Sequence, residues 1–333
     1  MASSFYTPFP VEVPYRTGPT MKRLGRTSED SGRLFVVDEA YEGYLEQKLN
    51  HLTRSPKRCS SLSAGRHEGL EDALLHIFGL VADEQPDLVR LEAKTVQLRA
   101  LGLRLRLEGA SRRRWTVETS SDAPLAVLGR RVKVHLDAQS DLMKLVHALA
   151  LSVQEDMVIL RDLGGDDEVE CLCVTFPSAW DPQEKVGRNF SEVHQPVANN
   201  AALLGAHRPV MNALFHKGPF VRFVWGLNAD GRLGQHPAEP ETALPRAVLR
   251  SPEALAAALF FRFRTERQIS VPLPEFGRCL FTVRVAAQPL SEALCNGERR
   301  RRFAAALTSM DEALLAYKGL SAWRDPLLAY LDV

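Results

Sequence analysis

The sequence predicts an α+β fold in which helices flank a mostly antiparallel sheet. Short runs with alternating apolar and polar residues, typical of half-buried strands, are most frequent in the second half of the chain. Strong turn signals at 228–231 and 274–277 follow such runs and favour antiparallel hairpins. Apolar stripes at helical spacing occupy both ends of the chain. Hairpins flanked by helices, without regular alternation of strand and helix, indicate the α+β class.

Composition is that of an ordinary water-soluble protein. The chain has 333 residues, a formal net charge of +1 and 25% charged residues, a balance that does not suggest nucleic acid as the main partner. The first fifteen residues lack the basic and apolar regions of a signal peptide, and no run approaches the ~18 apolar residues of a membrane span. We therefore expect a cytoplasmic protein.

Several common cofactor motifs are missing from the sequence. The five cysteines are scattered and include no C-x-x-C pair, so neither a zinc ribbon nor an iron-sulfur cluster is encoded. Neither G-x-G-x-x-G nor a Walker A motif occurs, which removes the usual cradles for dinucleotides and nucleotide phosphates. If this is a redox protein, its electrons come from elsewhere.

The N-terminal part predicts an arm, two helices and a linker. Residues 1–33 are expected to form an irregular arm. A helix follows the candidate N-cap Asp38, because apolar residues recur at helical spacing over 41–52. The Ser-, Arg- and Lys-rich segment 53–65 is typical of a mobile linker, and a second helix is predicted over 70–81.

The middle of the chain predicts a hairpin, a helix and a strand. Leucines alternate with other residues over 101–107, and this run is expected to pair with 115–118. A helix from Asp141 leads into a strand over 157–160. If the helix persists far enough, Asp156 falls on its apolar stripe, where a carboxylate is costly unless it is paired. Asp156 is therefore either satisfied structurally or used in a site.

The second half supplies further strands and two helices. Ser251 and Pro252 are typical of a helix start, with Ser as N-cap and Pro at the first helical position. Apolar residues at helical spacing between Phe303 and Tyr317 predict the final helix. The strands are expected at 171–176, 220–225, 259–271 and 279–285.

The most informative segment is 176–197, which combines Trp180, Lys185 and His194 with prolines and a glycine. It is too irregular for an ordinary strand or helix, and its hydrophobic anchors argue against disorder. We therefore expect an ordered site loop that presents His194 as a metal ligand or a base. A lone histidine is more often structural. His207, on an apolar helical stripe, is either a core residue or an alternative ligand.

Arginines are the second candidate group. Arg222, Arg264 and Arg267 lie in predicted strands, and a guanidinium presents a planar fork that suits carboxylates. Surface ion pairs are the alternative explanation for each arginine taken singly. The run from Arg264 to Gln268 is harder to explain in that way, because its charged and amide groups interrupt an apolar strand.

Several segments together resemble the heme-binding α subunits of heme-dependent oxidative N-demethylases. The resemblance extends from about Phe35 to the C-terminal end, and its segments occur in the order found in that family. The site loop contributes 176–180 (Phe-Pro-Ser-Ala-Trp), 184–187 (Glu-Lys-Val-Gly) and 193–197 (Val-His-Gln-Pro-Val). The remaining segments are 153–156, 222–225, 266–268, 280–284 and 316–320.

The resemblance implies a PAS-like sheet fold, with residues 34–333 as a single heme-binding PAS-like domain that carries additional N- and C-terminal helices. It implies a monooxygenase that holds heme b through a histidine. Such an enzyme removes an N-methyl group from a small secondary amine with O2 and releases formaldehyde. Electrons would come from NADPH through FMN and an iron-sulfur cluster on a partner subunit. This agrees with the absence of dinucleotide-binding and C-x-x-C motifs from the present sequence.

The resemblance also implies roles for individual residues. His194 is the expected axial ligand of the heme iron. A protonated amine is a cation and needs a carboxylate or an aromatic face. Glu266 is the preferred carboxylate, Glu155 and Asp156 are the alternatives, and Trp225 is the candidate face. The candidates for the heme propionates or the pocket wall are Lys185, Arg222 and Arg267.

The chain departs from the family pattern at a few positions. Val224 precedes Trp225 where the family commonly has Asn, and Ala198 stands where Pro is frequent. A lost amide near the pocket predicts a different substrate or a loss of activity. Two other functions therefore stay open: a heme-based gas sensor or carrier without turnover, and a heme-free interaction protein whose His and Arg residues are structural.

Overall fold

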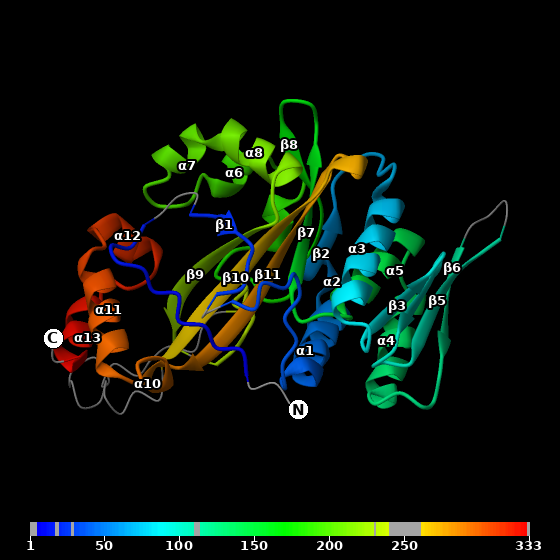
Figure 1. Ribbon diagram of the computed structural model, residues 1–333, viewed down its shortest axis with the longest axis horizontal. Helices are drawn as coiled ribbons and strands as arrows, with labels where there is room; N and C mark the ends of the chain where they lie inside the picture. The colour runs from blue at the N-terminus through cyan, green and yellow to red at the C-terminus, as the bar shows by residue number, and fades with distance from the viewer. Residues whose placement is uncertain are drawn as a thin grey trace.

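The computed structural model describes residues 5–16, 20–27, 30–109, 114–229, 231–239 and 261–331. Within these ranges the strands form a seven-stranded sheet and a four-stranded sheet, and helices pack on both faces of the larger sheet (Figure 1). The strand pairs of both sheets are antiparallel. The expected α+β class is confirmed, while its PAS-like character and the single domain at 34–333 stay predictions.

The larger sheet occupies the centre of the molecule. Its strands are β1 (Lys22–Arg23), β2 (Ser60–Leu62), β7 (Asp156–Asp162), β8 (Asp167–Cys173), β9 (Phe220–Asn228), β10 (Arg262–Leu273) and β11 (Arg278–Pro289). They lie in the order β1-β9-β10-β11-β7-β8-β2. The smaller sheet contains β3 (Val89–Glu92), β4 (Thr95–Leu98), β5 (Leu103–Glu108) and β6 (Arg114–Thr119).

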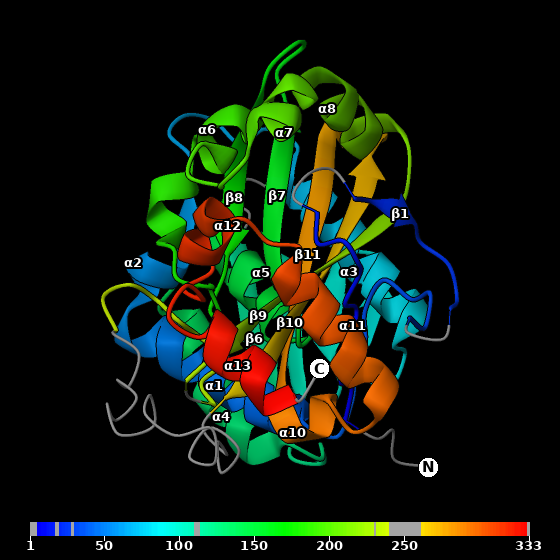
Figure 2. The same cartoon turned by 90° about the vertical axis from the view of Figure 1, so that its left-hand side faces the viewer.

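The helices fall into three groups around the larger sheet (Figures 1 and 2). One group lies between the two sheets: α1 (Tyr41–Arg54), α2 (Pro56–Cys59), α3 (Leu70–Glu84), α4 (Ala126–Asp137) and α5 (Asp141–Ala150). A second group follows β8: η1 (Pro182–Lys185), α6 (Phe190–His194), α7 (Ala201–Gly205) and α8 (His207–His216). The third group is C-terminal: α10 (Leu290–Ala293), α11 (Gly297–Thr308), α12 (Glu312–Tyr317) and α13 (Arg324–Leu331).

Strands β10 and β11 form a long hairpin of 12 residues each. They are joined by η3 (Pro274–Phe276) and Gly277, whose φ of 59° is a conformation that glycine adopts at low cost. The turn predicted at 274–277 is therefore confirmed. Asp230, in the other predicted turn, and the helix start predicted at Ser251 and Pro252 lie outside the described residues.

The two faces of the larger sheet differ in burial. On the inner face, Met157, Ile159 and Ile269 are buried in the main hydrophobic core together with residues of α3, α5 and the smaller sheet. The opposite face, called the site face below, carries the alternating residues of the same strands, many of which are only partly buried. A sheet that is open on one face offers a surface on which a ligand can bind.

Helices α6 to α8 cover part of the site face. Phe190 of α6 belongs to a hydrophobic cluster with Cys279 of β11, against which Leu160 of β7 also packs. Val193 of α6 and Trp180 of the preceding loop pack against a second cluster on β8. These contacts place the end of α6 above the middle of the sheet.

The expectation of a mobile linker at 53–65 is wrong. Pro56 starts α2, and β2 pairs with β8 at the edge of the larger sheet. Cys59, the last residue of α2, is buried. The Ser- and Arg-rich composition of this segment concealed an edge strand, because a strand of only three residues shows too little alternation to be recognised.

Other boundaries also differ from the predictions. The helix from Asp141 ends at Ala150, so Asp156 begins β7 and does not lie on a helical stripe. The predicted C-terminal helix is two helices: α11 ends at Thr308, and Asp311 caps α12 by accepting a hydrogen bond from the Leu314 amide at 2.8 Å. Strands β3 and β4 were not predicted. The loop at 176–197 contains η1 and α6.

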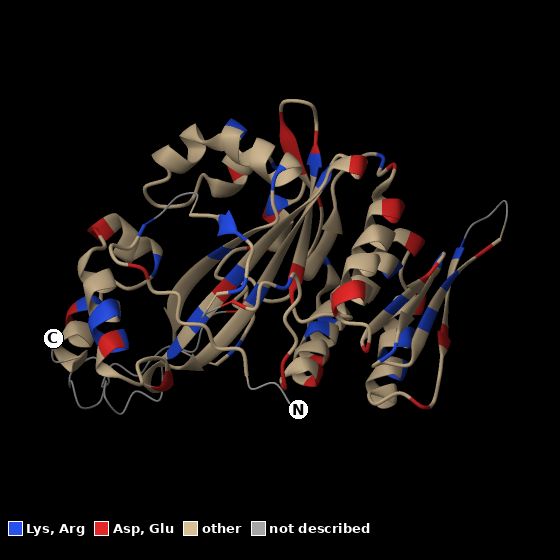
Figure 3. Cartoon of the chain, viewed as in Figure 1, with Lys and Arg blue, Asp and Glu red and all other residues tan. Residues whose placement is uncertain are grey.

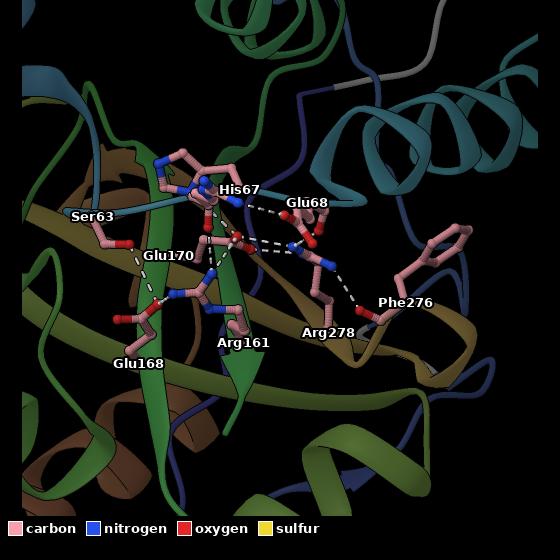
Figure 4. Close-up of polar contacts among 9 residues, drawn as sticks. Ser63, His67, Glu68, Arg161, Glu168, Glu170, Phe276 and Arg278 are labelled. Carbon is pink, nitrogen blue, oxygen red and sulfur yellow. Dashed lines mark hydrogen bonds and ion pairs between the residues drawn. The ribbon is translucent and has the colours of Figure 1, made fainter. Parts of the chain in front are cut away.

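A buried ion network ties three strands together on the inner face of the larger sheet (Figure 4). The carboxylate of Glu170 on β8 is fully buried and accepts hydrogen bonds from the Arg278 guanidinium at 2.7 and 2.9 Å and from Arg161 at 3.3 Å. The Nδ1 atom of His67 lies 3.3 Å from the same carboxylate. Because its charges are paired, we interpret this network as structural.

Charges elsewhere are distributed without a single dominant sign. Lys and Arg alternate with Asp and Glu along the ribbon (Figure 3), in line with the net charge of +1. Among the helices built from described residues, none combines the length and the apolar composition that crossing a membrane would require.

Candidate functional site

His194 is the last residue of α6, the helix that packs over the site face. The helix is only five residues long and is fixed at its start by a capping box between Asn189 and Glu192. The His194 Nδ1–H donates a hydrogen bond to the Phe190 carbonyl at 2.8 Å. Nε2 has no hydrogen-bond partner among the described residues. An imidazole held in this way presents a free lone pair.

The surroundings of His194 favour its neutral form. Burial lowers the pKa of His194 from its ordinary value of 6.5, and the nearby charges of Arg222 and Lys185 lower it further. The hydrogen bond to Phe190 opposes these effects. A neutral imidazole is the form that binds a metal, so His194 is suited to ligation at neutral pH.

Two of the predicted cations lie close enough to His194 to affect its pKa, and they are unpaired. Arg222 projects from β9, is largely buried and has no hydrogen-bond partner for its Nε. Burial lowers the pKa of Arg222. Lys185, at the end of η1, forms no ion pair within the described part of the chain. A buried cation without a partner is costly, and the Arg222 Nε is both buried and unsatisfied. Lys185 is only partly buried, and the two side chains are available to an anion.

The sheet beneath these groups is apolar and half-exposed. Strand register places Arg222 opposite Gln268, and Gln268 opposite Val283 of β11. Val283 is partly buried, as are its site-face neighbours Phe281 and Val158. The site therefore combines an apolar floor, a histidine with a free nitrogen and two unpaired cations.

Glu266 lies on the same face, one residue pair from Arg222. It is directly opposite Val224 of β9 in the strand register. Its carboxylate accepts hydrogen bonds from the Ser178 hydroxyl and from the Gln268 amide, the latter at 2.9 Å. The Arg264 guanidinium is 3.8 Å away and donates to Ser178 at 3.0 Å. These contacts hold the carboxylate in a fixed position.

Residues from both ends of the chain lie beside Arg222 and Glu266, and they were not predicted as site residues. Burial raises the pKa of Tyr15 to about 12 and that of Tyr317 above its ordinary value, and the charges of both Arg222 and Glu266 act on each hydroxyl. Lys318 Nζ donates to the Trp225 carbonyl at 2.7 Å and lies 4.7 Å from the centroid of the Tyr15 ring. Tyr317 and Lys318 lie in the segment 316–320, which is one of those that resemble the family. That resemblance was the one sequence signal that could have marked them as site residues.

Other predicted site residues lie apart from His194. Trp225 is buried in a hydrophobic cluster and stacks on Phe263, so its ring is not a free face. Arg267 is buried and is bound by Asp30 of the N-terminal arm through two hydrogen bonds, one of them 2.8 Å long. Because its guanidinium is already paired, it is poorly placed for a propionate.

The two alternative carboxylates have structural contacts. Glu155 accepts a hydrogen bond from the Val36 amide at 2.8 Å, and burial raises the pKa of Glu155. Asp156 accepts hydrogen bonds from Thr175 at 2.8 Å and from the Phe176 amide at 2.7 Å. Both carboxylates are essentially inaccessible to solvent. Of the three carboxylates considered, only Glu266 lies beside Arg222.

A comparison with protein-family models identifies the group to which this sequence is related. The family described as Haem-dependent oxidative N-demethylase, alpha subunit-like, matches residues 25–328. The chain belongs to this family. The family description indicates heme dependence, an oxidative demethylase type of chemistry and a multi-subunit enzyme. No curated protein matches the chain.

Proposed function

We propose that this family member binds heme b with His194 as axial ligand and oxidatively N-demethylates a small secondary or N-methylated amine with O2, releasing formaldehyde. One observation carries the proposal: His194 presents a free Nε2 beside two unpaired cations, Arg222 and Lys185, above a half-exposed apolar sheet face. The donor set fits heme, which has an apolar ring, two carboxylates and an iron that accepts an imidazole. We extend the proposal to a PAS-like fold for the domain.

Each of these side chains has a defined task in the proposal. His194 gives its Nε2 to iron, and the hydrogen bond from Nδ1–H to the Phe190 carbonyl fixes the ring and increases its basicity. Arg222 and Lys185 hold the two propionates, which neutralise cations that are otherwise unpaired. The bound heme supplies the activation of O2, which no side chain here provides.

Amine recognition is assigned to the Glu266 side of the site. An alkylammonium ion needs a carboxylate, and the Glu266 carboxylate is held in place by hydrogen bonds from Ser178 and Gln268. The nearby phenol of Tyr317 offers a partly exposed aromatic surface. Val224 faces Glu266 across the strands, so the amide that is common there in the family is replaced by an apolar wall. This wall favours an amine with larger alkyl groups than dimethylamine.

Electrons are proposed to come from NADPH through FMN and an iron-sulfur cluster on a partner subunit. The sequence encodes no dinucleotide-binding motif and no cysteine pair of its own. The words "alpha subunit" in the family description are consistent with such a division of labour.

The test is formaldehyde release by the heme-loaded protein with a competent NADPH-dependent reductase and a panel of N-methylated amines. We expect turnover that falls by about 100-fold or more in Glu266→Gln, because a buried charge interaction of ~3 kcal/mol is lost. Glu184→Gln, at an exposed position of the site loop, is the matched control and is expected to behave as wild type. Val224→Asn should shift preference towards the smallest amines.

One outcome would favour the gas-sensor alternative instead. Reversible binding of O2, CO or NO by the heme-loaded protein, with no formaldehyde from any amine, would leave heme binding in place and remove the enzymatic part of the proposal.

A further inference from the structure

We propose that Asp167 and His207 are positioning residues that fix the orientation of His194. This inference rests on the proposed role of His194 as axial ligand. It concerns residues that the resemblance did not mark. A continuous series of hydrogen bonds connects β8 to the His194 ring.

Asp167 anchors the start of α6. It is the first residue of β8 and is 2% exposed. One carboxylate oxygen accepts a hydrogen bond from the Phe190 amide at 2.9 Å, and the other accepts one from His207 Nε2 at 2.7 Å. Burial raises the pKa of Asp167, and the hydrogen bond from His207 opposes this shift. A buried carboxylate with both oxygens bound is a rigid point of attachment.

Phe190 transmits this constraint to His194. Its amide is held by Asp167, and its carbonyl accepts the hydrogen bond from His194 Nδ1 at 2.8 Å. Its ring lies between the two imidazoles, with centroids 4.2 Å from His194 and 5.5 Å from His207. Both the backbone and the ring of one residue therefore limit how the His194 ring can rotate.

His207 completes the connection through α8. Its Nε2 is bound to Asp167, and its Nδ1 lies 3.0 Å from the Ser191 hydroxyl. Because both ring nitrogens are engaged, His207 is not free to serve as the alternative ligand that its sequence position allowed. Together with Asp166, these residues place possible metal-ligand atoms within 4.8 Å of one another. Since Asp167 and His207 already bind each other and α6, we assign them to positioning.

Heme binding should depend on the Asp167 carboxylate. Loss of the Asp167 carboxylate releases the Phe190 amide and His207 together, so the His194 ring gains rotational freedom. Partners that orient a metal-ligating histidine typically change metal affinity by 10- to 100-fold when they are lost. We expect Asp167→Ala to weaken hemin binding by about tenfold or more. The Soret maximum and the Fe–His stretching frequency of the ferrous protein should also shift.

The experiment is a hemin titration of the full chain, followed by absorption and resonance Raman spectra. Asp167→Asn retains an oxygen for the Phe190 amide and should recover most of the affinity. Asp166→Ala removes an adjacent, exposed carboxylate and is the matched control, expected to resemble wild type. Circular dichroism reports whether each variant is folded. If Asp167→Ala does not fold, His207→Ala is the deciding variant and is expected to show the same spectral shift.

The outcomes separate the two proposals. If wild type binds hemin through His194, but the deciding variant keeps wild-type affinity and spectra, the positioning role is refuted and the proposed function is unaffected. If hemin binding by wild type is absent, or unchanged in His194→Ala, the proposed function fails and the positioning role fails with it.

Discussion

At the residue scale, the candidate site is defined by groups that lack partners. Most buried charges in the described ranges are paired, as Arg267 is with Asp30 and Arg284 is with Asp38. Arg222 is a buried guanidinium with an unsatisfied Nε, and it acts on the pKa of His194. Unpaired buried cations destabilise a protein unless a ligand binds them, which is why they mark the site.

Arg222→Met should weaken hemin binding by about 10- to 100-fold, because one charge-assisted hydrogen bond to a carboxylate contributes about 1.5–3 kcal/mol. The control is Arg188→Met in the site loop, where an exposed guanidinium is paired with Glu192 at 2.9 Å. Hemin titrations of both variants measure the difference. Equal affinities for the two variants would remove Arg222 from the site.

The pH dependence of ligation follows from the lowered pKa of His194. In the folded protein His194 takes up a proton only below its ordinary pKa of 6.5, whereas the unfolded chain does so near 6.5. Axial ligation should therefore persist at pH 6.5 and be lost as the pH falls through the lowered value. The Soret band followed from pH 8 to pH 4 tests this. A midpoint above 6.5 would contradict it.

At the scale of elements, alternation and turn chemistry predicted the sheet well. The β10–β11 hairpin was predictable because Pro274 and Gly277 are typical turn residues between two long apolar runs. Strand β2 was not predictable, because its pairing with β8 depends on a neighbour more than 100 residues away in the chain. The site loop was recognised as ordered, but its short helices depend on the Asn189 cap and on Asp167, which lies in another element.

The Glu170 network, which joins three strands, is expected to contribute to the stability of the fold and not to its function. Glu170→Ala leaves Arg278 buried without its partner and should lower the free energy of unfolding by about 3–5 kcal/mol. Glu68→Ala removes an exposed carboxylate nearby and should change it by less than about 1 kcal/mol. Urea unfolding measures both values. Heme spectra of folded Glu170→Ala should match wild type, because the network lies on the face of the sheet opposite α6.

Helices α4 and α5 share a buried histidine pair that predicts acid sensitivity. His135 Nε2 lies 2.9 Å from His147 Nδ1, and burial, followed by the charge of His135, lowers the pKa of His147 to about 3. The unfolded chain protonates this side chain near 6.5, so stability should fall as the pH drops from about 6.5 towards 3, by roughly 5 kcal/mol in full.

His147→Leu should make the free energy of unfolding less dependent on pH over this range, whereas His76→Leu, at an exposed position of α3, should not. Urea unfolding at several pH values compares the two variants with wild type. Equal slopes for all three proteins would show that the histidine pair does not titrate as described.

At the scale of the whole molecule, both ends of the chain reach the same part of the sheet. The Tyr15 amide donates a hydrogen bond to Ser309 across 294 residues of sequence, and Lys318 contacts the Tyr15 ring. The sequence placed His194, Arg222 and Glu266 in separate segments, and only strand register and α6 bring them to one face. Tyr15 could not be predicted, because it lies in an arm whose path depends on tertiary contacts.

The central claim is that His194 holds heme on the open face of this sheet. The most direct measurement is the absorption spectrum of the purified protein, as isolated and after addition of hemin, for wild type and His194→Ala. We predict a Soret band in wild type that is lost or shifted in the variant. A wild type without a band under any loading condition, or identical bands in both proteins, would contradict the account.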